Sequence, residues 1–293
     1  MKRIESTTSR TAEMTCVSRA ASYLETDSYY HSDDYLSVRL LPGLVGALFR
    51  VAPLRKLFVQ RVAPAGIYEY VIARTRYVDA AFKQALDEKF DQILLFGAGF
   101  DTRALRFHRG AGHTRIFELD APPTQGAKIK QYQKRGLTVP PNVVFVAIDF
   151  DKESIHDKLD QAGFRPAQKS LFLLEGLLMY LEPESVLAAF RLIEQYAGSG
   201  SRIVFDYVQA SVLRGEKTLY GEEGLVRVVS QAGEQWRFGF DPDEVTPFLA
   251  AYGFRVADHK DARELEACYF HDEVGRAIGR LNGTHCIVTA VRP

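Results

Sequence analysis

The sequence predicts an α/β fold built on a mostly parallel β-sheet, and two observations predict it. Between residues 93 and 205 the chain holds short apolar runs that are continuous rather than alternating, separated by helix-like segments. Continuous apolar runs are typical of strands that helices cover on both faces. The second observation is a glycine turn, Gly97-Ala98-Gly99, directly after the first run. Such turns let a ligand approach the backbone at the carboxyl edge of a parallel sheet.

The expected elements follow in chain order. The N-terminal third has a helical pattern, and strands are expected at 93–96, 116–119, 143–146, 171–174 and 203–205. A helix is expected from Pro183 to Tyr196, because Pro183 suits a first helical turn and Gly198 a stop. Another helix is expected near Pro242, after a long segment, 208–240, rich in glycine and charge. Loops of that length are usually functional or disordered, and we interpret this segment as a lid-like or substrate-selecting insertion.

The glycine turn indicates which nucleotide it receives. Asp101 lies where the pyrophosphate of a nicotinamide or flavin cofactor would rest, and Thr102 takes the place of the third glycine of a dinucleotide fingerprint. S-adenosylmethionine has no phosphate, and a nearby carboxylate would stabilise its positive sulfonium and ammonium groups. Asp120 ends the next predicted strand, at the spacing of a ribose-binding acid. The turn and Asp120 together predict a site for this cofactor.

Further blocks make the chain resemble the leucine carboxyl methyltransferase family, including its bacterial branch of small-molecule S-adenosylmethionine-dependent O-methyltransferases. The resemblance covers most of the chain, and the matching blocks are residues 18–20, 73–79, 95–103, 117–120, 147–150, 175–181 and 236–240. It implies a class I methyltransferase Rossmann-like sheet, mostly parallel, with a C-terminal antiparallel strand pair formed by residues 254–257 and 286–291. It also implies an N-terminal helical cap, residues 1–90, over a cofactor-binding domain, residues 91–293, in one structural unit.

The resemblance also implies roles for residues at the strand ends. Asp149 and the Phe150 main chain would meet the adenine, although Asp149 could instead cap a helix beginning near Asp151. Glu175 would face the methionine portion of the cofactor, with a buried acid paired to an arginine as the alternative. Arg74, and Arg19 after it, would compensate the cofactor carboxylate.

Arg103 begins a helix, and Asp79 or Glu118 is its expected partner. The sequence marks no general base, so the catalytic residues stay unassigned. Tyr180 and Tyr207, just after two strands, and His285, which opens the last strand, are candidates for the acceptor pocket. A carboxylate acceptor is already ionised at neutral pH and needs no base, whereas a hydroxyl acceptor would need one.

The leading functional interpretation is therefore O-methylation of a small metabolite, as in secondary metabolism. There are two alternatives. The protein transfers the methyl group to sulfur or nitrogen, or it is a regulatory module that binds the cofactor without turnover.

Composition sets limits on other functions. Lys plus Arg equal Asp plus Glu at 37 each, so the chain lacks the basic surplus expected of a nucleic-acid-binding protein. Three scattered cysteines, Cys16, Cys268 and Cys286, indicate reduced thiols of a cytoplasmic protein and neither a disulfide framework nor a metal site.

The most apolar stretch, residues 36–59, is interrupted by charged residues and prolines. No uninterrupted apolar run in it reaches the about 20 residues of a membrane span. We interpret it as a helical cap beside the ligand cleft rather than as a basic helix on a membrane surface. The oligomeric state is left open.

Overall fold

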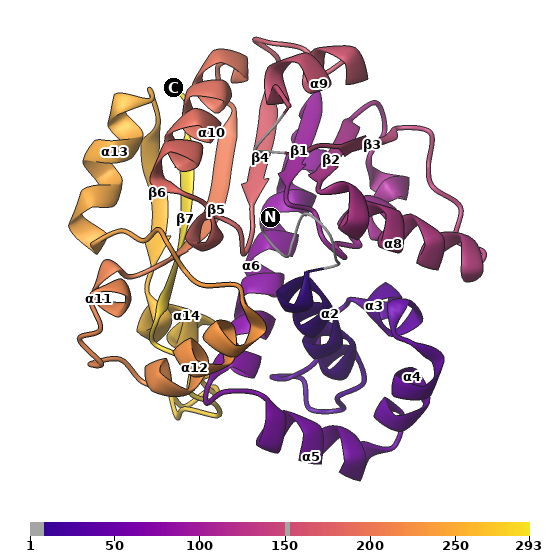
Figure 1. The fold of residues 1–293 in the computed structure, drawn as a ribbon, viewed down its shortest axis with the longest axis vertical. Helices are drawn as coiled ribbons and strands as arrows, with labels where there is room; N and C mark the ends of the chain where they lie inside the picture. The colour runs from indigo at the N-terminus through magenta and orange to yellow at the C-terminus, as the bar shows by residue number, and fades with distance from the viewer. Residues whose placement is uncertain (1–8, 150–152) are drawn as a thin grey trace.

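A computed structural model describes residues 9–149 and 153–293, and its centre is one mixed β-sheet (Figure 1). Within these residues seven strands pair in the order β3-β2-β1-β4-β5-β7-β6. Their bounds are β1 Gln92–Phe96, β2 Arg115–Asp120, β3 Val143–Ala147, β4 Ser170–Leu174, β5 Arg202–Val208, β6 Arg255–Lys260 and β7 His285–Val291. The first five strands run parallel, and β7 is antiparallel to both β5 and β6. This confirms the predicted fold class, including the antiparallel pair at the end of the chain.

Helices cover both faces of this sheet, which explains why the strands are apolar without alternation. Leu95 packs into a core built with α6 (Ile67–Asp87), while its neighbours Leu94 and Phe96 pack into a second core built with α10 (Pro183–Tyr196). Because successive strand residues point to opposite faces, both sets must be apolar when both faces are covered. The helix from Pro183 to Tyr196 is thus confirmed with its predicted bounds.

The remaining helices surround the carboxyl edge of the parallel strands or cover their faces (Figure 1). In the described part of the chain before α6, the helices are α2 Arg10–Tyr23, α3 Tyr35–Leu40, α4 Gly43–Phe49 and α5 Ala52–Val62. Those after β1 are α7 Arg103–Arg106, η1 His108–Gly110, α8 Pro122–Lys134, α9 Ile155–Ala162, η2 Leu178–Tyr180, α11 Ala210–Leu213, α12 Glu222–Ala232, η3 Pro242–Glu244, α13 Val245–Ala251 and α14 Ala262–Tyr269. The helix predicted near Pro242 corresponds to η3 and α13.

The segment 208–240, interpreted as an insertion, returns to the sheet that it leaves. Gln209 and Phe240 form an isolated bridge, and the Phe240 amide donates to the Val208 carbonyl at 3.2 Å. Between these points the segment carries α11 and α12. The insertion therefore leaves and rejoins the carboxyl end of β5.

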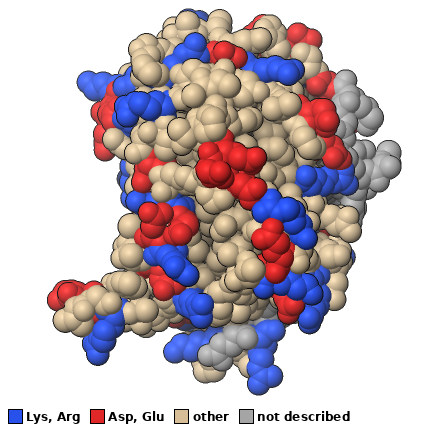
Figure 2. Space-filling view, turned by 90° about the vertical axis from the view of Figure 1, so that its left-hand side faces the viewer, with Lys and Arg blue, Asp and Glu red and all other residues tan. Residues whose placement is uncertain are grey.

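The described residues carry both signs of charge at the surface and hold no disulfide. Both signs of charge are interspersed on the face shown in Figure 2. All three cysteines are free. Across the described ranges no helix is both long and apolar enough to cross a bilayer, and no cluster of His, Cys, Asp and Glu side chains is arranged to hold a metal ion.

Candidate functional site

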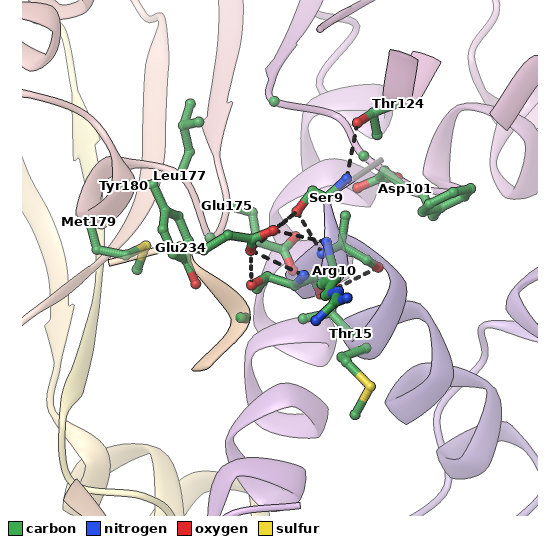
Figure 3. A pocket seen from close by; sticks show the side chains of 18 of the residues that line it. Ser9, Arg10, Thr15, Asp101, Thr124, Glu175, Leu177, Met179, Tyr180 and Glu234 are labelled. Atoms are coloured by element: carbon green, nitrogen blue, oxygen red, sulfur yellow. Dashed lines mark hydrogen bonds between the residues drawn. The ribbon is translucent and has the colours of Figure 1, made fainter. Parts of the chain in front are cut away.

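A cavity of about 700 Å³ opens at the carboxyl ends of β1, β2 and β4. The N-terminal helices α2 and α6 form one wall, and the insertion with α12 forms another. Figure 3 shows side chains from these separate parts of the chain around this cavity. Most of the predicted site residues line it: Arg19, Arg74, Gly97, Ala98, Gly99, Asp101, Asp120, Asp149, Glu175, Tyr180 and His285. The fold thus gathers residues that lie far apart in the sequence.

The glycine turn and the acid after β2 are in direct contact. Gly97 and Gly99 have φ angles of 61° and 48°, in the left-handed region that favours glycine. A Cβ on Gly97 would lie 2.9 Å from a methyl carbon of Leu177, so the turn has no room for a side chain. The Gly99 amide donates to one carboxylate oxygen of Asp120, and the Ala121 amide donates to the other at 2.7 Å. Burial raises the pKa of Asp120, which is about nine-tenths enclosed beside the cavity.

Asp101 lines the cavity, but its charge is already paired within the protein. Its Oδ1 accepts from the Arg103 amide at 2.6 Å, and its Oδ2 contacts the Arg103 guanidinium. Burial acts to raise the pKa of Asp101, but the charges of Arg103, Lys128 and Arg19 outweigh burial and lower it to about 2. The carboxylate is thus ionised, yet it is not a free partner for a cationic ligand as the sequence interpretation assumed.

Arg103 joins three carboxylates. Besides Asp101, it contacts Asp79 and Glu175 at 2.6 Å each. Asp79 was one of its two expected partners; the other, Glu118, instead pairs with Lys128 at 2.5 Å. Since Arg103 is almost completely buried, it holds the cavity floor together rather than facing a ligand.

A second ion-pair group centres on Arg74. Its Nη1 lies 2.8 Å from Asp206 Oδ2, and its Nε lies 3.0 Å from Glu175 Oε1. Asp206 also accepts from the Tyr70 hydroxyl at 2.7 Å and from the Gly176 amide at 2.5 Å. Burial acts to lower the pKa of Arg74, but the charges of Asp206 and Glu175 outweigh it, so the guanidinium stays charged. Glu175 is therefore paired to two arginines while it lines the cavity, which combines both sequence interpretations of this residue.

Arg19 is held in the same manner at another wall. Its Nε lies 2.9 Å from Asp34, and its Nη2 donates to the Phe100 carbonyl at 2.7 Å. Arg106 connects Asp34 to Asp79, so these pairs join the group around Arg103. Among the described residues, the connected network beside the cavity has four arginines and five carboxylates: Arg19, Arg74, Arg103 and Arg106 with Asp34, Asp79, Asp101, Glu175 and Asp206. With every member ionised, the network carries one net negative charge.

Asp149 marks the far end of the cavity. Its amide donates to Glu153 Oε2 at 2.8 Å. Helix α9 begins at Ile155 and is capped by Ser154, so Asp149 is not the cap of that helix. Phe150, the predicted adenine contact beside it, lies outside the described residues.

Of the three acceptor-pocket candidates, Tyr207 is misplaced by the sequence interpretation. It is completely buried among the side chains that pack on α10 and α13, and its hydroxyl contacts His259 Nε2 at 2.8 Å. The prediction failed because β5 continues through Val208, so alternate side chains point to opposite faces. Asp206, one position earlier, points to the α6 side, where it contacts the cavity-lining residues Arg74 and Tyr70. An ionisable residue inside an otherwise apolar strand was the available signal.

His285 and Tyr180 do line the cavity. The His285 ring stacks on Tyr70 with centroids 4.4 Å apart, meets Trp236 edge-on at 5.5 Å, and its Nδ1 lies 2.7 Å from the Thr284 hydroxyl. Burial lowers the pKa of His285 to about 4, so the imidazole is neutral near pH 7. Burial raises the pKa of Tyr180, which keeps its hydroxyl protonated.

Glu234, in the insertion, was not predicted from the sequence. Its carboxylate accepts from the Arg10 amide at 2.9 Å and the Thr11 amide at 3.2 Å, and also contacts the Thr11 hydroxyl (Figure 3). The first amides of a helix have no partner within the helix, and a carboxylate there is favoured by the helix dipole. Glu234 thus fastens the insertion to the start of α2 across the cavity. No local pattern relates residues so distant in sequence.

Comparisons with known proteins give consistent matches. A family model described as leucine carboxyl methyltransferase matches residues 12–194. YktD of Bacillus subtilis (strain 168), provisionally named an S-adenosyl-L-methionine-dependent methyltransferase, is 27% identical over 199 residues, which make up 68% of this chain and 65% of that protein. A Mycobacteroides abscessus protein with the same provisional name is 35% identical over 163 residues, 55% of this chain and 50% of that protein. The chain thus spans half to two thirds of the length of these relatives.

Two solved structures resemble the fold over nearly the whole chain. One is a provisionally named methyltransferase from Thermobifida fusca YX, with a TM-score of 0.59, 15% identity and coverage of 95% of this chain and 94% of that one. The other is a DUF574 family protein from Streptomyces avermitilis MA-4680, with a TM-score of 0.57, 16% identity and coverage of 99% and 100%. At these identities the likeness establishes the fold alone.

Proposed function

Because this chain belongs to the leucine carboxyl methyltransferase family, we propose that it is an S-adenosyl-L-methionine-dependent methyltransferase acting on an oxygen of a small metabolite. The observation that carries the proposal is the contact between the left-handed turn at Gly99 and the carboxylate of Asp120 at the cavity floor. An acid at this point of a parallel sheet accepts hydrogen bonds from the ribose hydroxyls of a bound nucleotide. Glycine in the turn lets the backbone approach the ligand closely. The provisional names of the curated relatives agree with this activity.

The cavity residues fit the cofactor group by group. Asp120 would receive the ribose hydroxyls, and Asp149 would lie at the adenine. Arg74 and Arg19 would face the cofactor carboxylate, and Glu175 its amino group. When bound, the cofactor supplies a methyl group that its sulfonium already activates.

The charge of the ion-pair network supports a cationic ligand more strongly than Asp101 alone. Among the described residues the network has one carboxylate more than it has arginines, and the acids Asp120, Asp149 and Glu234 also line the cavity. Charge interactions are strengthened where water is largely excluded. A ligand with a net positive charge reduces this negative surplus, whereas a dinucleotide with a negative pyrophosphate would add to the repulsion. This network therefore favours the sulfonium cofactor and disfavours NADH.

The acceptor would lie toward β5 and β7, beside Tyr180, Trp236 and His285. These side chains and the apolar residues of α6 and α12 enclose that part of the cavity, and exclusion of water favours a reaction in which opposite charges disappear. For a hydroxyl acceptor, His285 would take the proton because it lines this part of the cavity. For a carboxylate acceptor no proton moves, and the side chains only position the oxygen.

A substitution at His285 tests the proposal and separates the two oxygen acceptors. Purified protein is incubated with S-adenosylmethionine and a panel of hydroxyl and carboxylate compounds, and methylated products are detected by mass. For a hydroxyl acceptor, His285→Gln should lower the rate by about 10²–10⁴-fold, while a carboxylate acceptor should lose far less. Exposed His113→Gln is the matched control.

The same assay addresses the alternatives. Products methylated only on sulfur or nitrogen would replace the oxygen proposal. Cofactor binding without product from any acceptor would favour a regulatory module. We also retain the proposed division into a cap, residues 1–90, and a cofactor-binding domain, residues 91–293, in which the insertion near 208–240 acts as a lid.

A further inference from the structure

The segment formed by α4, α5 and the residues between them exposes an unusual number of apolar side chains. Leu44, Leu48, Val51, Leu54 and Leu57 are 77%, 46%, 48%, 43% and 51% exposed. These are five of the thirteen large apolar side chains exposed in the described chain, within fourteen consecutive positions. Single exposed apolar residues are common, but a concentration of them indicates an interaction surface. We call these five residues the outer face.

The inner sides of the same helices are packed against the protein. Phe49 is buried, and Arg55 is held by Glu25 at 3.0 Å and by the Phe49 carbonyl at 2.9 Å. These contacts fix the orientation of α5 and leave Leu54 and Leu57 outside. The expected cap beside the cleft thus accounts for the inner side only.

The charge of this segment has one sign. Residues 35–68 contain no Asp or Glu, and four exposed basic residues lie among the apolar ones: Arg39, Arg50, Lys56 and Arg61. None of the four forms an ion pair with a residue that the structure describes. In a chain with equal numbers of acids and bases, this local surplus lacks an internal partner.

A separate cavity beside the outer face strengthens this observation. It has a volume of about 390 Å³ and is lined by Arg39, Arg50 and Arg135, with no acid among its lining residues. Arg39 donates to the Arg135 carbonyl at 2.7 Å, and Arg135 donates to the Leu41 carbonyl at 2.8 Å, while Arg135 Nε is buried without a hydrogen-bond acceptor. Guanidinium groups gathered without an acid repel one another, and an anion such as a phosphate would relieve that repulsion.

We propose that the outer face and the arginine cavity dock this protein on the surface of an anionic lipid bilayer. The apolar side chains would enter the headgroup and acyl boundary, and the basic side chains would bind lipid phosphates. In Figure 1, α4 and α5 form the lower end of the molecule, where Figure 2 shows Lys and Arg gathered. These two helices therefore lie at the end of the molecule away from the sheet.

Charge complementarity favours lipid over a second copy of this chain. A twofold dimer through the outer face would place the same patch against itself. Like charges would then face each other with no acid available between residues 35 and 68. Docking on lipid would also bring the large cavity close to the bilayer, because Ala63 and Pro64, which follow α5 directly, line it.

Co-sedimentation of the full chain with vesicles tests this proposal. One vesicle type contains phosphatidylglycerol with phosphatidylcholine, and the other contains phosphatidylcholine alone. We expect binding to the anionic vesicles that salt weakens, and much weaker binding to the neutral ones. Each basic residue near an anionic surface contributes roughly a fivefold change, so Arg50→Ala/Lys56→Ala/Arg61→Ala should weaken binding at least tenfold.

Substitutions of the apolar side chains test whether the outer face enters the lipid. Leu54→Ser/Leu57→Ser should weaken vesicle binding about tenfold or more, while exposed Val274→Ser and Arg109→Ala serve as matched controls that leave it unchanged. Absence of wild-type binding to anionic vesicles, or full binding by Leu54→Ser/Leu57→Ser, would overturn the proposal. So would a dimer in solution that the same double substitution dissolves, because the face would then be an interface between copies. Cofactor titration of every variant confirms that its fold is intact and reports the proposed function separately.

Discussion

Replacing Asp206 by asparagine tests whether the buried network around Arg74 stabilises the cavity. The Asp206 side chain is completely buried and serves three donors, Tyr70, Arg74 and Gly176. Asparagine keeps the size of the side chain but removes its charge and one acceptor oxygen. Arg74 would then keep Glu175, whose side chain is 14% exposed, as its carboxylate partner.

The expected loss follows from this geometry. Removing one partner of a buried ion pair costs about 3–5 kcal/mol. Since Glu175 still compensates Arg74, we expect the lower end, about 3 kcal/mol of unfolding free energy. Tyr70→Phe, which removes one hydroxyl from the same carboxylate, should cost only about 1 kcal/mol.

Urea denaturation at pH 7 measures both values. A double-mutant cycle of Asp206→Asn with Arg74→Met should show that the two losses do not add, with a coupling of about 1–3 kcal/mol. The network would not be the stabilising unit described above if Asp206→Asn lowered the unfolding free energy no more than Tyr70→Phe does. The same conclusion would follow if the losses of Asp206→Asn and Arg74→Met simply added in the double variant.

Three further predictions follow from the site. Gly97→Ala forces a side chain into a left-handed turn against Leu177, so it should lower stability by about 1–2 kcal/mol and weaken S-adenosylmethionine binding; a wild-type melting temperature and affinity would contradict this. Glu234→Gln removes the charge at the start of α2 and should lower the unfolding free energy by about 1 kcal/mol. It should also speed cofactor dissociation in stopped-flow measurements. An unchanged dissociation rate would show that the contact of Glu234 with α2 does not hold the insertion closed over the cofactor. The pKa of Asp101 falls from 3.8 to about 2 on folding, so between these values the folded protein binds fewer protons at this carboxylate than the unfolded chain does. The ionised Asp101 carboxylate therefore contributes fully to stability above about pH 4, and this contribution is lost as the pH falls toward 2. Asp101→Asn should flatten that part of the curve of unfolding free energy against pH.

Much of the fold was accessible from the sequence because both faces of the sheet are covered. Continuous apolar runs then mark the strands, and Leu94 and Leu95 serve different cores. The contact of Gly99 with Asp120 was also predictable, since adjacent parallel strands end at one edge.

What the sequence did not reveal depends on side-chain direction and long-range contact. Tyr207 was assigned to the cavity, but the one-residue alternation along β5 buries it on the opposite face and points Asp206 toward Arg74, which lines the cavity. Two contacts beside the cavity also escaped prediction: Asp101 is compensated by Arg103, and the Glu234 carboxylate accepts from the distant Arg10 amide. Such choices depend on packing in three dimensions rather than on spacing.

Calorimetric titration with S-adenosylmethionine, and in parallel with NADH, tests the central claim most directly. We predict micromolar binding of S-adenosylmethionine by the wild-type protein, its loss in Asp120→Ala and Arg74→Ala variants that retain a cooperative melting transition, and no binding of NADH. Failure of well-folded wild-type protein to bind S-adenosylmethionine, or tighter binding of NADH, would contradict the claim that this cavity is a methyltransferase cofactor site.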